Sequence, residues 1–370
     1  GDFGGGNFYV VGKAGIVTDT INGVDKGIVA MVGGDANARE PLIQKLWVQG
    51  DGAFNNKDLS TTIGVRTGDN SSAMSDYEFK VNYHHAGVML TGFGGSQEKH
   101  PYRVHSTYCN HAIYAATRVN SANTVTINLY AQDAWHWYTE ENGFDGSVNL
   151  ILNVESRKDP GDGTPAIYVR NGKTFRIGGV YRGGNGTYQL IVDKSSSGGV
   201  DSLVFDNLRA IDCYGIWDIR RVRRLDGHLS LRDMKNPNTA GAAPGPTLKL
   251  GRIWHAGGFT CDISDCAAVE GIHIGDAVNY PISAVISGLS VQMGNSDAGA
   301  GSYPMTMTAL MVENMTDSVV EMRQCAGRAA IGIDVIDSDI ILQRPTQRYT
   351  ITNNAPLGTR VGYPILDLAG

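Results

Sequence analysis

One spacing of apolar residues, at relative positions 0, 2 and 5, recurs along this chain and restricts its fold more than any other feature. One copy is Cys261, Ile263 and Cys266, within the stretch FTCDISDCAAVEGIHI at 259–274. Further copies begin at Val125, Phe175, Leu208, Leu229, Ala284 and Val320, with weaker copies at Leu150 and Ile340. The smallest steps between neighbouring copies are 20, 21, 23 and 25 residues. A second apolar pair follows most copies, as in Ile272/Ile274.

A spacing of two residues is typical of an extended strand, in which side chains point alternately to opposite faces. Two strands and a turn in every 20–25 residues indicate a solenoid whose stacked coils share a continuous apolar interior. The pattern therefore predicts an all-β fold, a right-handed parallel β-helix of about nine or more coils. A β-sandwich or a propeller is the alternative, although a propeller blade needs about 40–45 residues.

Three sections are expected along the chain. Residues 1–120 fit the repeat poorly and are predicted to form an N-terminal cap with the first irregular coils. Residues 121–345 are predicted to form the β-helix, and residues 346–370 a C-terminal cap or tail. A distinct first section is expected because a solenoid needs an atypical terminal repeat to cover its interior.

Composition excludes several classes of function. The net charge of −6 disfavours nucleic acid as a partner, because nucleic-acid binding depends on an excess of positive charge. The sequence contains no run of about 18 apolar residues, so membrane insertion is not expected. The five cysteines show no paired spacing typical of zinc sites or disulfide frameworks. We expect mostly free, buried thiols, no metal and no cofactor.

Aspartates occupy the outward positions of successive coils. Asp212, Asp233 and Asp265 fall in one predicted column, and Asp262 falls in the neighbouring column. With adjacent coils about 4.8 Å apart, Asp212 and Asp233 would be roughly 5 Å apart, and Asp212 and Asp265 roughly 10 Å apart. Stacked like charges destabilise one another unless they are neutralised or used.

The aspartate columns support a catalytic hypothesis. Glycoside cleavage uses two carboxylates, about 5–5.5 Å apart in retaining enzymes and 6.5–9.5 Å apart in inverting ones. Asp212, Asp233, Asp262 and Asp265 are therefore predicted to supply the acid, base or nucleophile. Four cationic side chains are predicted to bind the substrate beside them: Arg209, Arg232, His228 and His273. The alternative is that the aspartates stabilise turns at the coil corners, as aspartate often does.

A second candidate for binding is the aromatic stretch WHWY at 135–138, which is followed by Glu140 and Glu141. Because aromatic faces pack against sugar rings, Trp135 and Trp137 are predicted to contact the substrate. Packing within a loop is the alternative interpretation. The arginine run IRRVRRL at 219–225 is interpreted as a solvated surface, an intersubunit contact or a site for an anionic polymer.

The coil pattern, with motifs such as NLRAIDCYGI and ISDCAAVEGIHI, resembles the right-handed parallel β-helix proteins of the pectate-lyase-like group. The start GDFGGGNFYVV and the QGDG at 49–52 resemble the entry region of bacteriophage tailspike proteins. This resemblance implies a homotrimer on a virion tail, or an extracellular protein, that recognises a polysaccharide. It also implies depolymerase activity by hydrolysis or β-elimination, without assigning any residue.

The function expected from the sequence is cleavage of a bacterial capsular or extracellular polysaccharide by carboxylate-based glycoside hydrolysis. One alternative is a lyase acting by β-elimination, with His228 as a candidate base and Arg209 or Arg232 neutralising a uronate. A second alternative is a glycan-binding receptor-recognition protein without turnover. A third is a glycan-rearranging enzyme on the same fold.

Overall fold

The computed structural model describes residues 8–11, 18–32, 45–52, 60–67, 77–90, 102–116, 124–141, 146–159, 161–193, 200–234, 245–266, 270–293, 308–326, 328–336, 339–342 and 360–362. These residues contain no helix, and their strands pair mostly in parallel as a β-solenoid of about 6 turns. The predicted all-β parallel solenoid is confirmed. The number of turns differs slightly from the predicted nine or more coils. The right-handed sense of winding stays a prediction.

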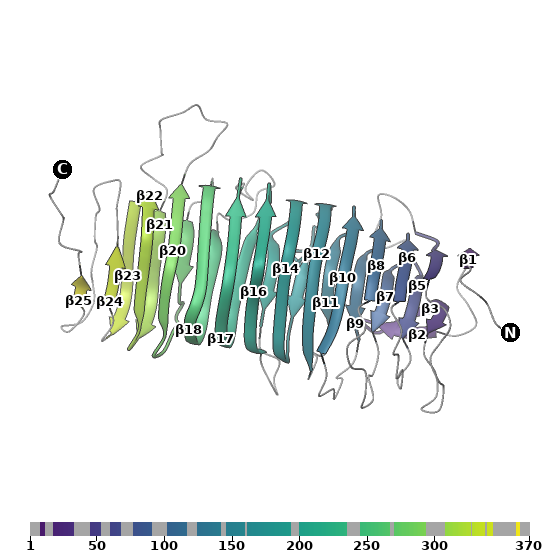
Figure 1. Ribbon diagram of the computed structural model, residues 1–370, viewed down its shortest axis with the longest axis horizontal. Helices are drawn as coiled ribbons and strands as arrows, with labels where there is room; N and C mark the ends of the chain where they lie inside the picture. Colours follow the sequence, from purple (N-terminus) through teal and green to yellow (C-terminus); the bar gives the residue numbers. More distant parts are fainter. Residues whose placement is uncertain are drawn as a thin grey trace. The chain divides into compact units, whose positions relative to one another are not determined.

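The chain divides into two compact units, of which unit 1 comprises Gly1–Gly186 and Asp193–Asp201. Its strands form two parallel ladders that the chain visits alternately (Figure 1). The first ladder contains β1 (Phe8–Val11), β4 (Lys45–Gln49), β6 (Tyr77–Asn82), β8 (Tyr102–Thr107), β10 (Thr124–Gln132), β12 (Ser147–Arg157) and β14 (Gly172–Gly184). The second ladder contains β3 (Val24–Val32), β5 (Thr62–Thr67), β7 (Ala86–Leu90), β9 (His111–Ala115), β11 (His136–Glu140) and β13 (Ile167–Val169).

Unit 2 comprises Thr187–Val192 and Ser202–Gly370. One ladder joins β17 (Ile216–Arg232), β18 (Pro246–Cys266), β20 (Val285–Met293), β22 (Val319–Ala326), β24 (Asp339–Leu342) and β25 (Arg360–Gly362). The other joins β15 (Tyr188–Val192), β17, β18, β19 (Glu270–Ile274), β21 (Thr308–Thr316) and β23 (Arg328–Ile336). The long strands β17 and β18 contribute to both ladders, and β16 (Val200–Ile211) precedes them.

The interior consists of apolar columns that run from strand to strand. In unit 1, Phe79, Val104, Leu129 and Leu152 occupy paired positions of β6, β8, β10 and β12, and none is more than 2% exposed. Burying each side chain contributes about 1.5–3 kcal/mol. The next residue in this column is Gly179, whose φ is +95° and whose added Cβ would lie 2.1 Å from the Leu152 carbonyl oxygen.

Buried thiols occupy interior positions as predicted. Cys109, Cys213 and Cys261 are free and buried. Burial raises the pKa of the Cys109 thiol to about 11, so this thiol is protonated at neutral pH. The side chains of Cys266 and Cys325 lie outside the described residues.

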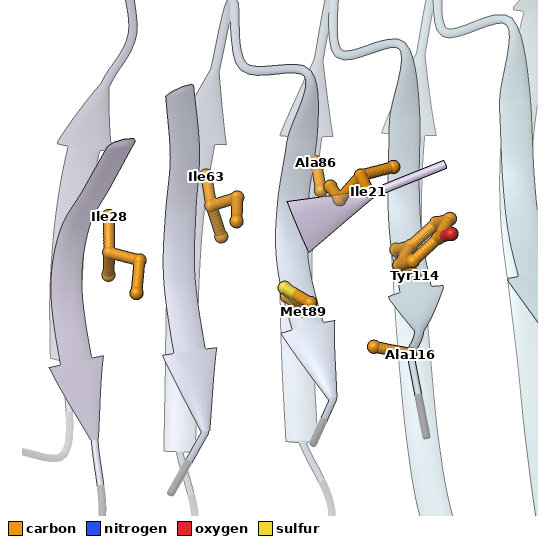
Figure 2. Close-up of a cluster of buried hydrophobic side chains, with 7 residues drawn as sticks. All are labelled: Ile21, Ile28, Ile63, Ala86, Met89, Tyr114 and Ala116. Carbon is orange, nitrogen blue, oxygen red and sulfur yellow. The ribbon is translucent and has the colours of Figure 1, made fainter. Parts of the chain in front are cut away.

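An antiparallel hairpin packs against the second ladder of unit 1. It joins β2 (Thr18–Ile21) to β3 through Asn22 and Gly23, whose φ values of 50° and 78° fit a type I′ turn. Figure 2 shows Ile21 over the strands that carry Ala86 and Tyr114, within a buried apolar cluster. The Arg66 Nε also pairs with Asp19 Oδ2 at 2.5 Å. The hairpin is therefore held both by apolar packing and by an ion pair.

The parallel pairing of β6, β8 and β10 continues across residue 120, on both sides of the predicted section boundary. The section boundaries at 120 and 345 stay predictions. None of the described residues forms a helix with the length and apolar character needed to cross a membrane.

Candidate functional site

The predicted aspartate column begins at two corners of the solenoid. Asp212 and Asp233 follow β16 and β17 and have left-handed φ values of 55° and 52°. The Asp212 N–H donates to the carbonyl of Arg232 at 3.0 Å, so the two corners are adjacent. Aspartate is one of the few residues other than glycine that adopts this conformation readily. This backbone requirement alone accounts for an aspartate at both corners, and their catalytic role stays a prediction.

Asp262 lies on β18 with its side chain 58% exposed. It pairs with Ser230 on one side and Ser290 on the other. The register in which the repeat aligns Cys261 with Ala284 was wrong, because irregularities in β18 and β20 shift the pairing. The side chain of Asp265 lies outside the described residues, so the column is described only in part.

The predicted substrate-binding cations separate into two groups. His228 Nε2 lies 3.8 Å from Asp262 Oδ2, and Arg232 pairs with Asp233 at 3.5 Å. Arg209 is exposed on β16. His273, on β19 in the other ladder of unit 2, has no contact with these aspartates among the described residues.

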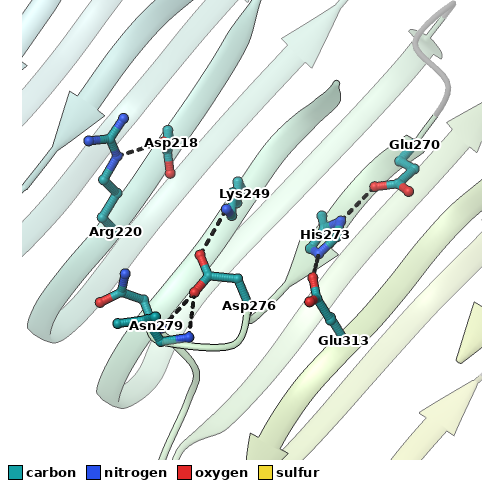
Figure 3. Close-up of polar contacts among 9 residues, drawn as sticks. Asp218, Arg220, Lys249, Glu270, His273, Asp276, Asn279 and Glu313 are labelled. Carbon is teal, nitrogen blue, oxygen red and sulfur yellow. Dashed lines mark hydrogen bonds and ion pairs between the residues drawn. The ribbon is translucent and has the colours of Figure 1, made fainter. Parts of the chain in front are cut away.

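His273 is held between two carboxylates (Figure 3). Its Nδ1 lies 2.7 Å from Glu270 Oε2 and its Nε2 lies 3.0 Å from Glu313 Oε2. Burial lowers the pKa of His273, but the hydrogen bonds and charges of both glutamates outweigh burial and raise the pKa overall. Both ring nitrogens donate only in the imidazolium form, so this site is built for a charged histidine.

The structure corrects the prediction for Trp137. Its indole is fully buried and packs edge-on against Tyr181 in the interior, with ring centroids 6.0 Å apart. No ring face is therefore available to a sugar. Trp135 is 5% exposed, and the Lys158 ammonium lies 5.3 Å from its ring centroid. Both indoles serve mainly as packing groups in this conformation.

A pocket of about 350 Å³ lies on the second ladder of unit 1. Its volume falls within the range of small-ligand sites. The chemically active side chains that line it come from successive turns: His85, His111, His136, Glu141, Tyr168 and Arg170. Sequence-distant turns thus bring histidines, a carboxylate and an arginine into one cavity.

Stacked imidazoles form one wall of this pocket. The rings of His111 and His136 stack with centroids 4.5 Å apart, and His85 meets His111 edge-on at 5.5 Å. His136 Nδ1 donates to the carbonyl of Pro165 at 2.8 Å. That bond fixes the ring orientation and, in the neutral form, leaves the lone pair on Nε2. His136 Nε2 lies 3.5 Å from the Thr164 hydroxyl oxygen, which also lines the pocket.

Glu140 is buried, and its carboxylate accepts three hydrogen bonds. Its Oε1 accepts from the Tyr138 hydroxyl at 2.8 Å, and its Oε2 accepts from the backbone N–H groups of Arg170 and Asn171 at 2.7 and 3.1 Å. Burial raises the pKa of Glu140 to about 7, although these hydrogen bonds oppose the increase. Because three donors occupy its oxygens, Glu140 positions the loop that carries Arg170.

Glu141 is half-buried in the pocket wall and is more accessible than Glu140, while the exposed Asp162 also lines the pocket. Burial raises its pKa, while Tyr114, the Asn22 backbone and Arg170 lower it by smaller amounts. The Arg170 guanidinium donates to the Glu141 carbonyl and stacks over the Tyr168 ring at 4.6 Å. Asn22, at the hairpin turn, also lines the pocket. The β2–β3 hairpin therefore forms part of the wall beside Glu141.

An exposed column on the first ladder offers aromatic faces and a cation. The paired positions are Trp47, Lys80, His105 and Tyr130. The Lys80 ammonium lies 4.7 Å from the Trp47 ring centroid, and the His105 and Tyr130 rings stack 4.9 Å apart. The side chain of His105 is 43% exposed, and Tyr130 is 44% exposed. This column provides flat surfaces at the strand spacing.

The part of the chain that the structure describes contains no group of three or more His, Cys, Asp or Glu residues able to hold a metal ion.

Sequence reasoning missed the histidine pocket, although a signal for it exists. His85, His111 and His136 lie 26 and 25 residues apart, close to the period of the coils. Because residues 1–120 fit the apolar repeat poorly, the repeat does not align His85 and His111 with His136. The Asn22–Gly23 pair is likewise a strong local signal for the hairpin that borders the pocket.

Comparisons with known proteins add no relative: no protein-family model, no curated protein and no solved structure matches this chain.

Proposed function

We propose that this chain cleaves a polysaccharide and that the histidine pocket of unit 1 is its active site. The observation that carries the proposal is the convergence of His136, Glu141 and Arg170 on one cavity. Acid–base cleavage needs two proton-transfer groups within reach of one bond, and an imidazole and a carboxyl group meet that need.

Hydrolysis assigns distinct roles to the two groups. Glu141, whose pKa is raised by burial, would protonate the glycosidic oxygen as its bond to the anomeric carbon breaks. His136 would take the proton from the water whose oxygen bonds to that carbon. The Pro165 carbonyl would stabilise the resulting imidazolium through Nδ1.

Elimination is the second candidate reaction, and Arg170 is the observation that favours it. In this reaction, His136 would remove the proton on the carbon beside the carboxylate of a uronic acid, a C=C bond would form as the neighbouring C–O bond breaks, and Glu141 would protonate the departing oxygen. A guanidinium pairs with carboxylates in a planar, two-point geometry. Arg170 would thus neutralise the carboxylate and favour loss of the proton.

The aromatic column on the first ladder supports a polymeric substrate. Trp47, His105 and Tyr130 expose ring surface on β4, β8 and β10 of one ladder, in which neighbouring strands lie about 4.8 Å apart and Lys80 of β6 lies between Trp47 and His105. Ring faces of this kind pack against the apolar faces of sugars. The same column also suits a protein that binds a glycan without cleaving it, which is the non-catalytic alternative. The tailspike assignment, the homotrimer and the virion or extracellular location are further proposals from the sequence resemblance.

The test is incubation of the protein with a panel of purified bacterial capsular and extracellular polysaccharides. New reducing ends without absorbance from unsaturated uronates would support hydrolysis, and reducing ends with that absorbance would support elimination. We expect Glu141→Gln and His136→Gln to reduce cleavage at least about a hundredfold, the usual size of an acid–base contribution. Binding without cleavage on every glycan would contradict the enzyme proposal and favour the non-catalytic alternative.

A further inference from the structure

Two arginines of unit 2 lie on neighbouring strands above one tryptophan. Arg221 of β17 pairs directly with Arg252 of β18 in the parallel register. Their guanidinium carbons lie 5.4 and 5.0 Å from the ring centroid of Trp254. All three side chains are half-buried. The arrangement is a flat aromatic surface flanked by two cations.

These two positive charges are not neutralised by the described residues. Neighbouring arginines of the same run have carboxylate partners: Arg220 pairs with Asp218 at 2.8 Å, and Arg224 pairs with Asp226. Arg221 and Arg252 form no ion pair or hydrogen bond within the described part of the chain. The buried Nε of Arg252 lacks an acceptor there.

Such an arrangement is costly unless an anion completes it. Like charges at paired positions of adjacent strands, about 4.8 Å apart, repel each other. A buried N–H without an acceptor adds a desolvation cost. A carboxylate or sulfate bound between the guanidiniums would offset both costs, because guanidinium donates two parallel hydrogen bonds to such groups.

The tryptophan indicates what kind of molecule carries the anion. A free inorganic anion gains nothing from an indole face, whereas the apolar face of a sugar ring packs well against it. The net charge of −6 disfavours a nucleic acid, whose binding depends on many phosphate contacts. An anionic sugar unit matches both the cations and the ring.

We propose that Arg221, Arg252 and Trp254 form a binding site for an anionic sugar unit, bearing a carboxylate or a sulfate ester, of a glycan chain. The inference deepens the proposed function by naming a substrate class, and it rests on that proposal for the glycan itself. None of the three residues lines the histidine pocket. The site therefore holds the chain rather than taking part in bond cleavage.

Binding is measured by isothermal titration on the Glu141→Gln protein, so that no probe is degraded. The probes are a hexasaccharide of galacturonic acid, a sulfated dextran oligosaccharide, a neutral dextran oligosaccharide of equal length, inorganic sulfate and a short single-stranded DNA. We expect one or both anionic glycans to bind, and the neutral glycan, inorganic sulfate and DNA to bind at least about tenfold more weakly. The carboxylated and sulfated arms identify which group the site prefers.

Variants assign the binding to this site. Arg252→Gln, which removes a charge-assisted contact, and Trp254→Ala, which removes the ring face, should each weaken binding about tenfold. Arg224→Gln, which removes an exposed positive charge from the neighbouring strand β17, should change it less than twofold. Arg221→Lys keeps the positive charge but should still weaken binding, because lysine lacks the planar two-point geometry of a guanidinium.

Equal weakening by Arg224→Gln would overturn the proposal, since it would indicate nonspecific attraction to positive charge. Equal binding of neutral dextran, inorganic sulfate or DNA would also overturn it. Failure here leaves the proposed function separately testable, because the wild-type protein would still generate reducing ends from a polysaccharide. Conversely, an inactive pocket with intact binding at Arg252 would contradict only the enzymatic role.

Discussion

At the scale of single residues, solenoid corners select for side chains that tolerate a left-handed backbone. Tyr83, Tyr108 and Asp133 in unit 1, like Asp212 and Asp233 in unit 2, have φ values between 51° and 60° at such corners. The periodic aspartates that suggested catalysis thus share a backbone requirement with tyrosines. The sequence pattern placed aspartates at the corners. A left-handed backbone and a catalytic carboxylate would both select aspartate there, so the pattern alone does not distinguish the two explanations.

Substitutions at Asp212 distinguish conformation from chemistry. Asp212→Val should destabilise the protein by about 1–2 kcal/mol, because a β-branched residue is strained in the left-handed region. Asp212→Asn and Asp212→Gly should stay close to the wild-type stability. Urea denaturation of the three variants measures these differences. A large destabilisation by Asn would show that the carboxylate charge, rather than the backbone, determines this position.

His273 makes the stability of unit 2 depend on pH. Its pKa is raised in the folded state above the ordinary value of 6.5. The folded protein therefore binds the proton more tightly, so the stabilisation is complete below pH 6.5 and is lost as the pH rises through the folded pKa. Denaturation midpoints are measured from pH 5 to pH 9. For the wild type they should decrease as the pH rises through the folded pKa of His273, and they should change less for His273→Gln. An identical pH profile for both proteins would refute this role.

At the scale of elements, period-two patterns identify strands and faces but not the register between them. Val125 was aligned with Leu150 and instead pairs with Val148, an even shift that keeps both side chains inside. Cys261 was aligned with Ala284 and instead pairs with Leu289, an odd shift. An irregularity in β20, where Gly288 has a φ of 77°, absorbs the odd residue. No alternation pattern reports such a bulge, so the predicted column beyond Asp262 was wrong.

The β2–β3 hairpin links a local turn to the pocket. Gly23 has a φ of 78° and no neighbouring heavy atom within 4 Å of an added Cβ, so Gly23→Ala adds backbone strain without a clash. We expect a loss of about 1–2 kcal/mol of hairpin stability and faster amide exchange in β2. Cleavage should weaken as well, because Asn22 lines the pocket.

Val24→Thr, at a position 55% exposed in the same hairpin, is the matched control for Gly23→Ala. It should leave both amide exchange and cleavage nearly unchanged. Unchanged exchange in Gly23→Ala would show that the turn does not limit the stability of the hairpin.

The interior columns are sensitive to loss of volume. Leu152 is 2% exposed and lies between Leu129 and Gly179 in its column. Leu152→Ala should lower the free energy of unfolding by about 2–5 kcal/mol, because the rigid backbone at Gly179 limits collapse of the cavity. Ile151→Ala, an exposed neighbour on the same strand, should cost less than about 0.5 kcal/mol. Urea denaturation measures the free energy of unfolding of both variants. Equal losses in the two would contradict the assigned interior.

At the scale of the whole molecule, the repeat was sufficient to predict a parallel β-solenoid, because stacked coils are the simplest way to bury such a pattern. The candidate pocket could not be predicted in the same way. It combines histidines from three turns with the turn of a hairpin whose first strand, β2, lies outside the parallel ladders, and their meeting depends on the registers of β7, β9 and β11. The sequence drew attention to Glu140 and Glu141 without indicating their partners.

The most direct test of the account compares two carboxylate variants on the same polysaccharide. The initial rate of reducing-end formation is measured for the wild type, Glu141→Gln in the pocket, and Asp233→Asn at the corner of unit 2. Both variants remove one carboxylate charge, and thermal unfolding confirms that each is folded. If the histidine pocket is the active site, Glu141→Gln loses cleavage activity at least about a hundredfold, whereas Asp233→Asn keeps near wild-type cleavage. Full activity in Glu141→Gln together with a comparable loss in Asp233→Asn would contradict it and place catalysis at the aspartate column.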